Sequence, residues 1–229
     1  MQTITVEFPL RGDWTAVHTP AEKVPSHGVD VLGQTYAYDF LRVDWNKDGF
    51  IFHDKSTIRF FTIGVSVNCC YGFGEPIYSP VNGKVVAVKD GLADHRWVHP
   101  IKDYLAMYAR AFYMWLSSKP DLHKIIGNYF IVKIDDMDAY AFFAHAKKHS
   151  IKVHPGEKVR YGQQLANVGH TGNSTAPHLH FHVMDRADLL SAQGLPCNFK
   201  KYEALNNGAW VTKEHEMPAK REQIRVKDA

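Results

Sequence analysis

The stretch HLHFHV at residues 178–183 places three histidines at alternate positions, with apolar side chains between them. Side chains of a β-strand point alternately to its two faces, so a strand here carries three imidazoles on one face. Imidazoles two residues apart are separated by about 6.6 Å along the strand, and neighbouring rings can converge on one metal ion. The stretch therefore predicts a strand over 178–184 that carries a metal site. The alternative is an amphipathic strand whose polar face happens to be histidine.

Similar short alternating runs, separated by Gly, Pro and Asn, extend on the N-terminal side of this strand. They predict further strands at 58–67, 84–89, 129–134, 140–146 and 164–168. Turn residues such as Asn82-Gly83 and Pro155-Gly156 separate them. The expected fold class is mainly β, an antiparallel two-sheet sandwich or partly open barrel.

One segment departs from the strand pattern and has helical spacing. Pro100 suits the first turn of a helix and Pro120 lies just beyond its end, so we expect a helical insertion at about 100–118, within residues 90–127. The apolar stripe of this helix favours packing against the core over ligand binding. Its members fall three and four residues apart: Ile101, Leu105, Tyr108, Phe112 and Trp115, with Tyr104 and Tyr113 beside them.

Length and composition limit the class of protein to which this chain can belong. The 229 residues suit a single domain, with a core at about 25–185 and an extension at 186–229 whose last part is expected as exposed surface or a tail. A formal charge of +3 without a basic run in the core does not indicate a nucleic-acid binder. Three cysteines cannot form a disulfide framework, whereas 14 histidines direct attention to metal chemistry.

Targeting signals are not evident in the sequence. The N-terminus lacks a basic region followed by an apolar one, and no stretch approaches the ~20 apolar residues of a membrane span. We therefore expect no membrane span and a cytoplasmic protein as written. A periplasmic or extracellular location is the alternative if a leader was removed or export is non-standard.

Three further residues are candidates to complete a metal site with the 178–183 stretch. His145 lies in the strand-like run YAFFAHA, Asp39 is a single carboxylate in YAYDF, and His27 lies in SHGVD. A carboxylate among aromatic residues is costly to bury unless a cation or hydrogen bonds compensate it. For Asp39, a metal-binding role and a hydrogen-bonding role in a turn both remain open.

The run TGNSTAPHLHFHV at residues 171–183 resembles the core of the lysostaphin-type zinc metallopeptidases. The resemblance extends over about residues 25–185 and includes the strand-like runs at 74–88 and 140–146. It implies a zinc-dependent metalloendopeptidase, a hydrolase with one Zn²⁺ ion that acts on peptide or peptidoglycan substrates. By position, His180 and Asp39 correspond to zinc ligands, and His145 and His178 to the catalytic histidines.

One position departs from the family pattern. The first zinc-binding histidine usually precedes the aspartate by four residues, and Thr35 stands there. We expect His27 to complete the site with Asp39 and His180. A compressed motif made by His27 and Asp30 and a degenerate site that binds metal poorly are the alternatives.

The expected chemistry is peptide-bond hydrolysis by a zinc-bound water. Three protein ligands leave a coordination position open, and zinc lowers the pKa of a bound water to about 7. By analogy with the family, His145 and His178 would hold or move the proton. Two other functions remain open: a non-catalytic wall-binding or regulatory homologue of the same fold, and a non-haem iron oxygenase, whose facial triad also uses two histidines and a carboxylate.

Overall fold

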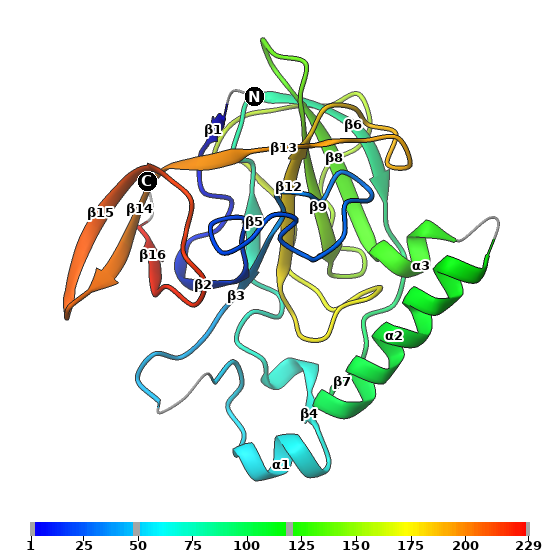
Figure 1. The fold of residues 1–229 in the computed structure, drawn as a ribbon, viewed down its shortest axis with the longest axis vertical. Coiled ribbons are helices and arrows are strands. Elements are labelled where there is room, and N and C mark those ends of the chain that lie inside the picture. Colours follow the sequence, from blue (N-terminus) through cyan, green and yellow to red (C-terminus); the bar gives the residue numbers. More distant parts are fainter. Residues whose placement is uncertain (1–2, 48–50, 118–120, 228–229) are drawn as a thin grey trace.

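One long, curled sheet forms the framework of the protein (Figure 1). The computed structural model describes residues 3–47, 51–117 and 121–227, with the backbone alone at 111, 114 and 115. The described strands of the sheet follow the spatial order β1-β14-β16-β2-β3-β12-β9-β8-β6-β10, with β13 beside β12 and β15 beside β14. Their bounds are β1 (Ile4–Val6), β2 (Gly12–His18), β3 (Tyr38–Leu41), β6 (Gly83–Lys89), β8 (Asn128–Ile134), β9 (Tyr140–Ala146), β10 (Lys158–Val159), β12 (Leu179–Met184), β13 (Gly194–Leu195), β14 (Cys197–Asn206), β15 (Ala209–Glu216) and β16 (Ile224–Val226). Two small pairs complete the strands: β5 (Pro76–Tyr78) with β11 (Gln164–Asn167), and β4 (Val65–Ser66) with β7 (Trp97–Val98).

The sheet is mixed and open, so the expected antiparallel two-sheet sandwich is only partly right. β1 and β14 are parallel, whereas the other neighbours in the described sheet are antiparallel. Phe199 of β14 nevertheless packs on Tyr38 and Phe40 of β3, with ring centroids 5.1 and 5.6 Å apart. Three strand spacings of about 4.8 Å would separate β14 from β3 in a flat sheet, so the sheet curls over onto its own middle.

The middle strands are buried on both faces. Phe143 and Phe181 join the main core, while Phe142 and Met184 join a second cluster on the opposite face with Ile126 of α3 (Leu122–Ile126). This explains why β12 is buried along its whole length and β9 everywhere except at Tyr140. The polar side chains of these strands, histidines among them, are therefore held in a rigid and largely dry environment.

The predicted helical insertion is confirmed as α2 (Pro100–Leu116). Pro100 occupies its first turn, and the His99 ring caps it by accepting from the Lys102 amide. The expected packing of its apolar stripe against the core is wrong, because the stripe faces solvent, with Leu105 65% exposed. Figure 1 shows α2 and the short α1 (Thr57–Thr62) projecting from one end of the sheet. Exposed apolar side chains along α2 are Ile101, Tyr104, Leu105, Tyr108, Phe112, Tyr113 and Leu116; the side chain of Trp115 lies outside the described residues.

Most of the other predicted strands are confirmed, and one is wrong. The predicted strands at 84–89, 129–134, 140–146, 164–168 and 178–184 are confirmed as β6, β8, β9, β11 and β12. The predicted strand at 58–67 is wrong, because Ser56 caps α1 by accepting from the Arg59 amide and only the short β4 follows. The expected tail instead forms the exposed strand β15 and the strand β16, which pairs with β2. In the described part of the chain, no helix has the length and apolarity to cross a membrane.

Candidate metal centre

The buried carboxylate of Asp39 is surrounded by four histidine rings from different parts of the chain. The distances to its oxygens are 2.9 Å for His18 Nδ1, 2.9 Å for His27 Nε2, 2.9 Å for His180 Nδ1 and 3.5 Å for His178 Nε2. Burial alone would raise the pKa of Asp39, but the positive charge and hydrogen bonds available from these rings hold that pKa well below its usual value. The carboxylate is therefore an anion in a site built from nitrogen donors.

Strand register brings Asp39 and His180 together. β3 and β12 are neighbours, and their antiparallel pairing sets Asp39 directly opposite His180. Directly opposed residues project their side chains from the same face of a sheet. His180 therefore lies on the face of Asp39, while Leu179 and Phe181 lie in the core on the other face, as the alternation in HLHFHV predicts.

His145 reaches the same site because of a bulge in β9. Between β8 and β9 the register shifts, so that Ala144 and His145 together oppose Tyr129 alone. Regular alternation would turn His145 away from the face of Ala144, which pairs with His180. Instead His145 adopts a positive φ of 63°, uncommon for a residue with a side chain, and its ring lies 4.8 Å from that of His178. Backbone strain of this kind is characteristic of functional sites.

His145 and His178 are each anchored through one ring nitrogen, which leaves the other nitrogen directed elsewhere. His145 Nδ1 donates to the Thr171 carbonyl at 2.8 Å, and His178 Nδ1 donates to the Ala176 carbonyl at 2.7 Å. Because a carbonyl oxygen only accepts, each ring carries a proton on Nδ1. In the neutral form of either ring, Nε2 is therefore the basic atom. Nε2 of His178 is the atom that faces Asp39.

The two anchored histidines differ in basicity. Burial and the neighbouring rings of His178 and His180 hold the pKa of His145 well below its usual value. Burial also opposes protonation of His178, but the charge of Asp39 and hydrogen bonding to it outweigh that effect and raise the pKa of His178. One ring is therefore neutral and the other is biased toward the imidazolium, which is a pairing suited to acid–base chemistry.

The rings of His27 and His180 also have partners on their far sides. His27 Nδ1 lies 3.0 Å from Ser26 Oγ, and His180 Nε2 lies 3.1 Å from His182 Nδ1. The His182 ring is itself stacked on Phe142 at 4.6 Å between centroids. Hydrogen bonds of this kind orient the ligands of metal sites and fix which nitrogen faces the ion.

The donor set fits a zinc ion. Imidazole nitrogen and carboxylate oxygen bind zinc at about 2.0–2.2 Å, which sets tetrahedral donors about 3.4 Å apart. Ring nitrogens of His27 and His180 each lie 2.9 Å from an oxygen of Asp39, so both rings would move outward to reach that spacing. Among the described residues, the metal-binding atoms of His18, His27 and Asp39 form the one group of three or more His, Cys, Asp or Glu atoms within 4.8 Å of each other, and His180, on the other carboxylate oxygen, lies outside that group.

The structure brings together the site residues expected from the sequence, adds His18 to them and leaves Asp30 outside. His27, Asp39 and His180 converge, with His145 and His178 beside them. Asp30 is exposed and instead accepts a hydrogen bond from the Thr35 hydroxyl, away from the histidines. The addition is His18, at the end of β2. Sequence reasoning missed it because AVHTP contains no motif and its strand was not expected.

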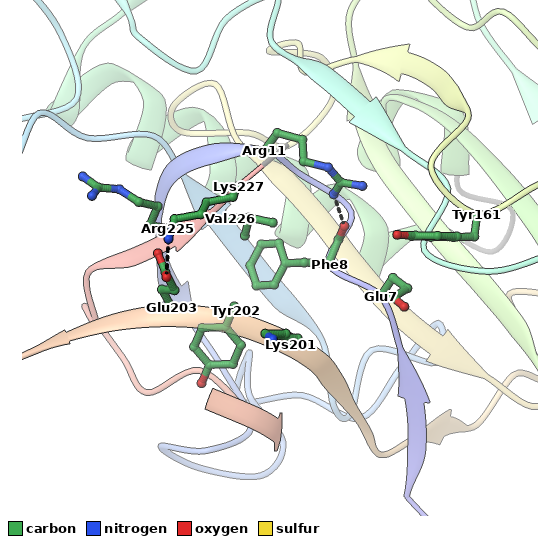
Figure 2. Close-up of a pocket in the computed structure, with 10 residues that line it drawn as sticks. All are labelled: Glu7, Phe8, Arg11, Tyr161, Lys201, Tyr202, Glu203, Arg225, Val226 and Lys227. Carbon is green, nitrogen blue, oxygen red and sulfur yellow. Dashed lines mark hydrogen bonds and ion pairs between the residues drawn. The ribbon is translucent and has the colours of Figure 1, made fainter. Parts of the chain in front are cut away.

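A cavity in another part of the molecule is distinct from this centre. It has a volume of about 180 Å³ and lies beside β14 and β16 (Figure 2). Its charged groups already have partners, since Arg11 donates to the Phe8 carbonyl at 2.8 Å and Lys227 to Glu203 at 2.6 Å. It shares no residue with the histidine cluster, so the chemistry of the protein is not expected there.

Two comparisons of the sequence match peptidases. The sequence profile of peptidase family M23 matches residues 111–192, a segment that includes His145, His178 and His180. Peptidoglycan DD-endopeptidase ShyB from Vibrio cholerae is 29% identical over 135 residues, which cover 56% of this chain and 24% of ShyB. The matched part of this chain thus spans about a quarter of that relative.

Two solved structures match the chain at low sequence identity. A zinc-containing peptidase from Vibrio cholerae has a TM-score of 0.42 and 21% identity, over 84% of this chain and 39% of that chain. The catalytic domain of lysostaphin from Staphylococcus simulans has a TM-score of 0.40 and 18% identity, over 79% of this chain and 86% of that chain. The profile match confirms the resemblance to the lysostaphin-type family for one segment: residues 111–192 match peptidase family M23.

Proposed function

We propose that this chain is a zinc-dependent endopeptidase that hydrolyses peptide bonds in peptidoglycan crosslinks. In this proposal His27, Asp39 and His180 hold one zinc ion, and His145 and His178 are the catalytic residues. The observation that carries the proposal is the convergence of ring nitrogens on the buried Asp39 carboxylate at 2.9 Å, with two backbone-anchored histidines alongside. Neither a purely structural cluster nor a surface histidine patch explains why the sheet buries so many basic groups together.

Zinc bound there would supply a water of lowered pKa and polarise the carbonyl of the scissile bond. The neutral His145, its proton fixed on Nδ1 by the Thr171 carbonyl, has Nε2 available to take a proton from the attacking water. His178, biased toward its charged form by Asp39, is suited to donate a hydrogen bond or a proton to oxygen or to the leaving amine. This division of labour follows from the pKa directions of the two rings.

The match of residues 111–192 to a peptidase family supports the hydrolase class, and the substrate class is inferred from a relative. ShyB is named a peptidoglycan DD-endopeptidase, and the shared region includes part of this chain only. A peptide crosslink of peptidoglycan is therefore the substrate we propose. Such a substrate implies a working site outside the cytoplasm.

The test is hydrolysis of purified peptidoglycan, followed by the release of free amines. Chelation should abolish amine release, and added zinc should restore it. His145→Ala and His178→Ala should lose activity while keeping one zinc per chain, whereas Asp39→Ala should lose the zinc. His154→Ala is the matched control, because its side chain is 83% exposed and lies beside Glu157 rather than Asp39. Amine release that persists in zinc-free protein would contradict the proposal.

A further inference from the structure

The imidazole of His18 makes the same contact with Asp39 as the imidazole of His27 does. His18 Nδ1 and His27 Nε2 both lie 2.9 Å from Oδ2 of Asp39, and the two ring centroids are 4.8 Å apart. Together with His180 on the other carboxylate oxygen, three ring nitrogens therefore surround one carboxylate. A zinc site with one open position needs only two of them beside Asp39.

A bulge in β2 directs His18 to this position. Ala16 pairs with Phe40, and the next pair is His18 with Asp39, so Val17 is the extra residue. In a regular ladder Val17 would oppose Asp39, and His18 would lie on the opposite face. The bulge thus brings a third imidazole to the face that carries Asp39.

His18 differs from the other two histidines in how it is held. Its side chain is 46% exposed, against 17% for His27 and 9% for His180. The second ring nitrogens of His27 and His180 lie against Ser26 and His182, whereas the structure gives Nε2 of His18 no such partner among the described residues. Ligands without supporting hydrogen bonds are the less firmly oriented ones.

We propose that His18 is a fourth protein ligand of the metal, and that it is the ligand that leaves when water or substrate enters. This inference rests on the proposed zinc function. Three protein ligands leave a catalytic position open, whereas four close a tetrahedral site. The exposed His18, whose Nε2 has no hydrogen-bond partner among the described residues, can swing into solvent by leaving only Asp39 and the neighbouring ring of His27. The resting centre is then closed, and hydrolysis requires His18 to move.

The competing role for His18 is a simple hydrogen bond to Asp39, without contact to metal. His18→Asn separates the two roles, since the amide can still donate to the carboxylate but is a poor ligand for zinc. The measurements are the zinc affinity, by competition with a chromophoric chelator, and the visible absorption of the Co²⁺-substituted protein. His154→Asn is the matched control on the exposed surface.

If His18 is a ligand, His18→Asn should weaken zinc binding at least about tenfold. Its Co²⁺ absorption bands should shift, because a water oxygen replaces a ring nitrogen in the coordination of the ion. His154→Asn should match the unaltered protein in both readouts. Unchanged affinity and absorption in His18→Asn would overturn the inference and leave the proposed function intact. Failure of the unaltered protein to bind Zn²⁺ or Co²⁺ would overturn both.

Discussion

Acidification from pH 7 to pH 5 should lower the unfolding free energy by about 2 kcal/mol through His170 alone. His170 is fully buried, its Nδ1 lies 2.9 Å from Ser174 Oγ, and its ring lies 5.0 Å from that of His95. Burial, followed by repulsion from His95 and His178, lowers the pKa of His170 to about 3. The native protein therefore keeps this ring neutral where an unfolded chain would protonate it.

The sign and size follow from proton linkage. An unfolded histidine has a pKa of about 6.5, so between that pH and about 3 the unfolded chain binds one more proton than the native protein. The contribution of His170 to the unfolding free energy is therefore fully present above the pKa of the unfolded chain, and it is lost as the pH falls below that pKa. At pH 5 the unfolded ring is almost fully protonated, and the loss relative to pH 7 is about 1.4 pKa units at 1.36 kcal/mol each.

The assay is urea unfolding followed by tryptophan fluorescence at pH 7 and pH 5, with a chelator present so that metal release does not contribute. His170→Asn keeps a polar group near Ser174 but does not titrate, so its loss between the two pH values should be about 2 kcal/mol smaller than that of the unaltered protein. His154→Asn, on the exposed surface, should behave as the unaltered protein does. Equal losses for His170→Asn and the unaltered protein, within about 0.5 kcal/mol, would refute the reasoning.

Four further substitutions check three separate features. Leu105→Ala, on the exposed face of α2, should change the unfolding free energy by less than about 0.5 kcal/mol, whereas Leu165→Ala in the core should cost about 2–5 kcal/mol in the same urea titration. Gly172→Ala should distort or unfold the loop between β11 and β12, because a Cβ there would meet the backbone nitrogen of Gly127 at 2.3 Å and φ is +68°. Circular dichroism and zinc content measure the effect. Ser174→Ala should lower peptidoglycan hydrolysis about tenfold with zinc content unchanged, because the hydroxyl lies 3.2 Å from Nδ1 of His178, which we propose to be catalytic; full activity in this variant would contradict that positioning role.

Much of the sheet was predictable because its central strands repeat a local pattern. Alternation in HLHFHV and the apolar run of β9 are properties of neighbouring residues, and both strands formed where that pattern predicts them. The α2 helix was also predictable, from its spacing and from Pro100. The face that α2 turns to solvent was not, because the spacing of apolar residues identifies a stripe but not what lies opposite it.

The candidate site was predictable only as far as its motifs extend. His180 and Asp39 stand in recognisable strands, and the pairing of those strands places them opposite each other. His18 has no motif, and its place beside Asp39 depends on one extra residue in β2 that sequence spacing does not reveal. The turn of His145 toward His178 likewise depends on a bulge and a positive φ, which are long-range consequences of strand register.

His27 comes from a long connection, residues 19–37 between β2 and β3. Contacts within that connection help to fix its place, since the Ser26 amide donates to the Thr35 carbonyl and the Gly28 amide to the Pro25 carbonyl. The same connection also packs on the rest of the fold, because Leu32 lies against the second core cluster and the Thr19 hydroxyl donates to the Pro218 carbonyl. Changes confined to residues 25–28 therefore offer a way to tune how tightly the protein would hold a metal without altering the strands that carry Asp39 and His180.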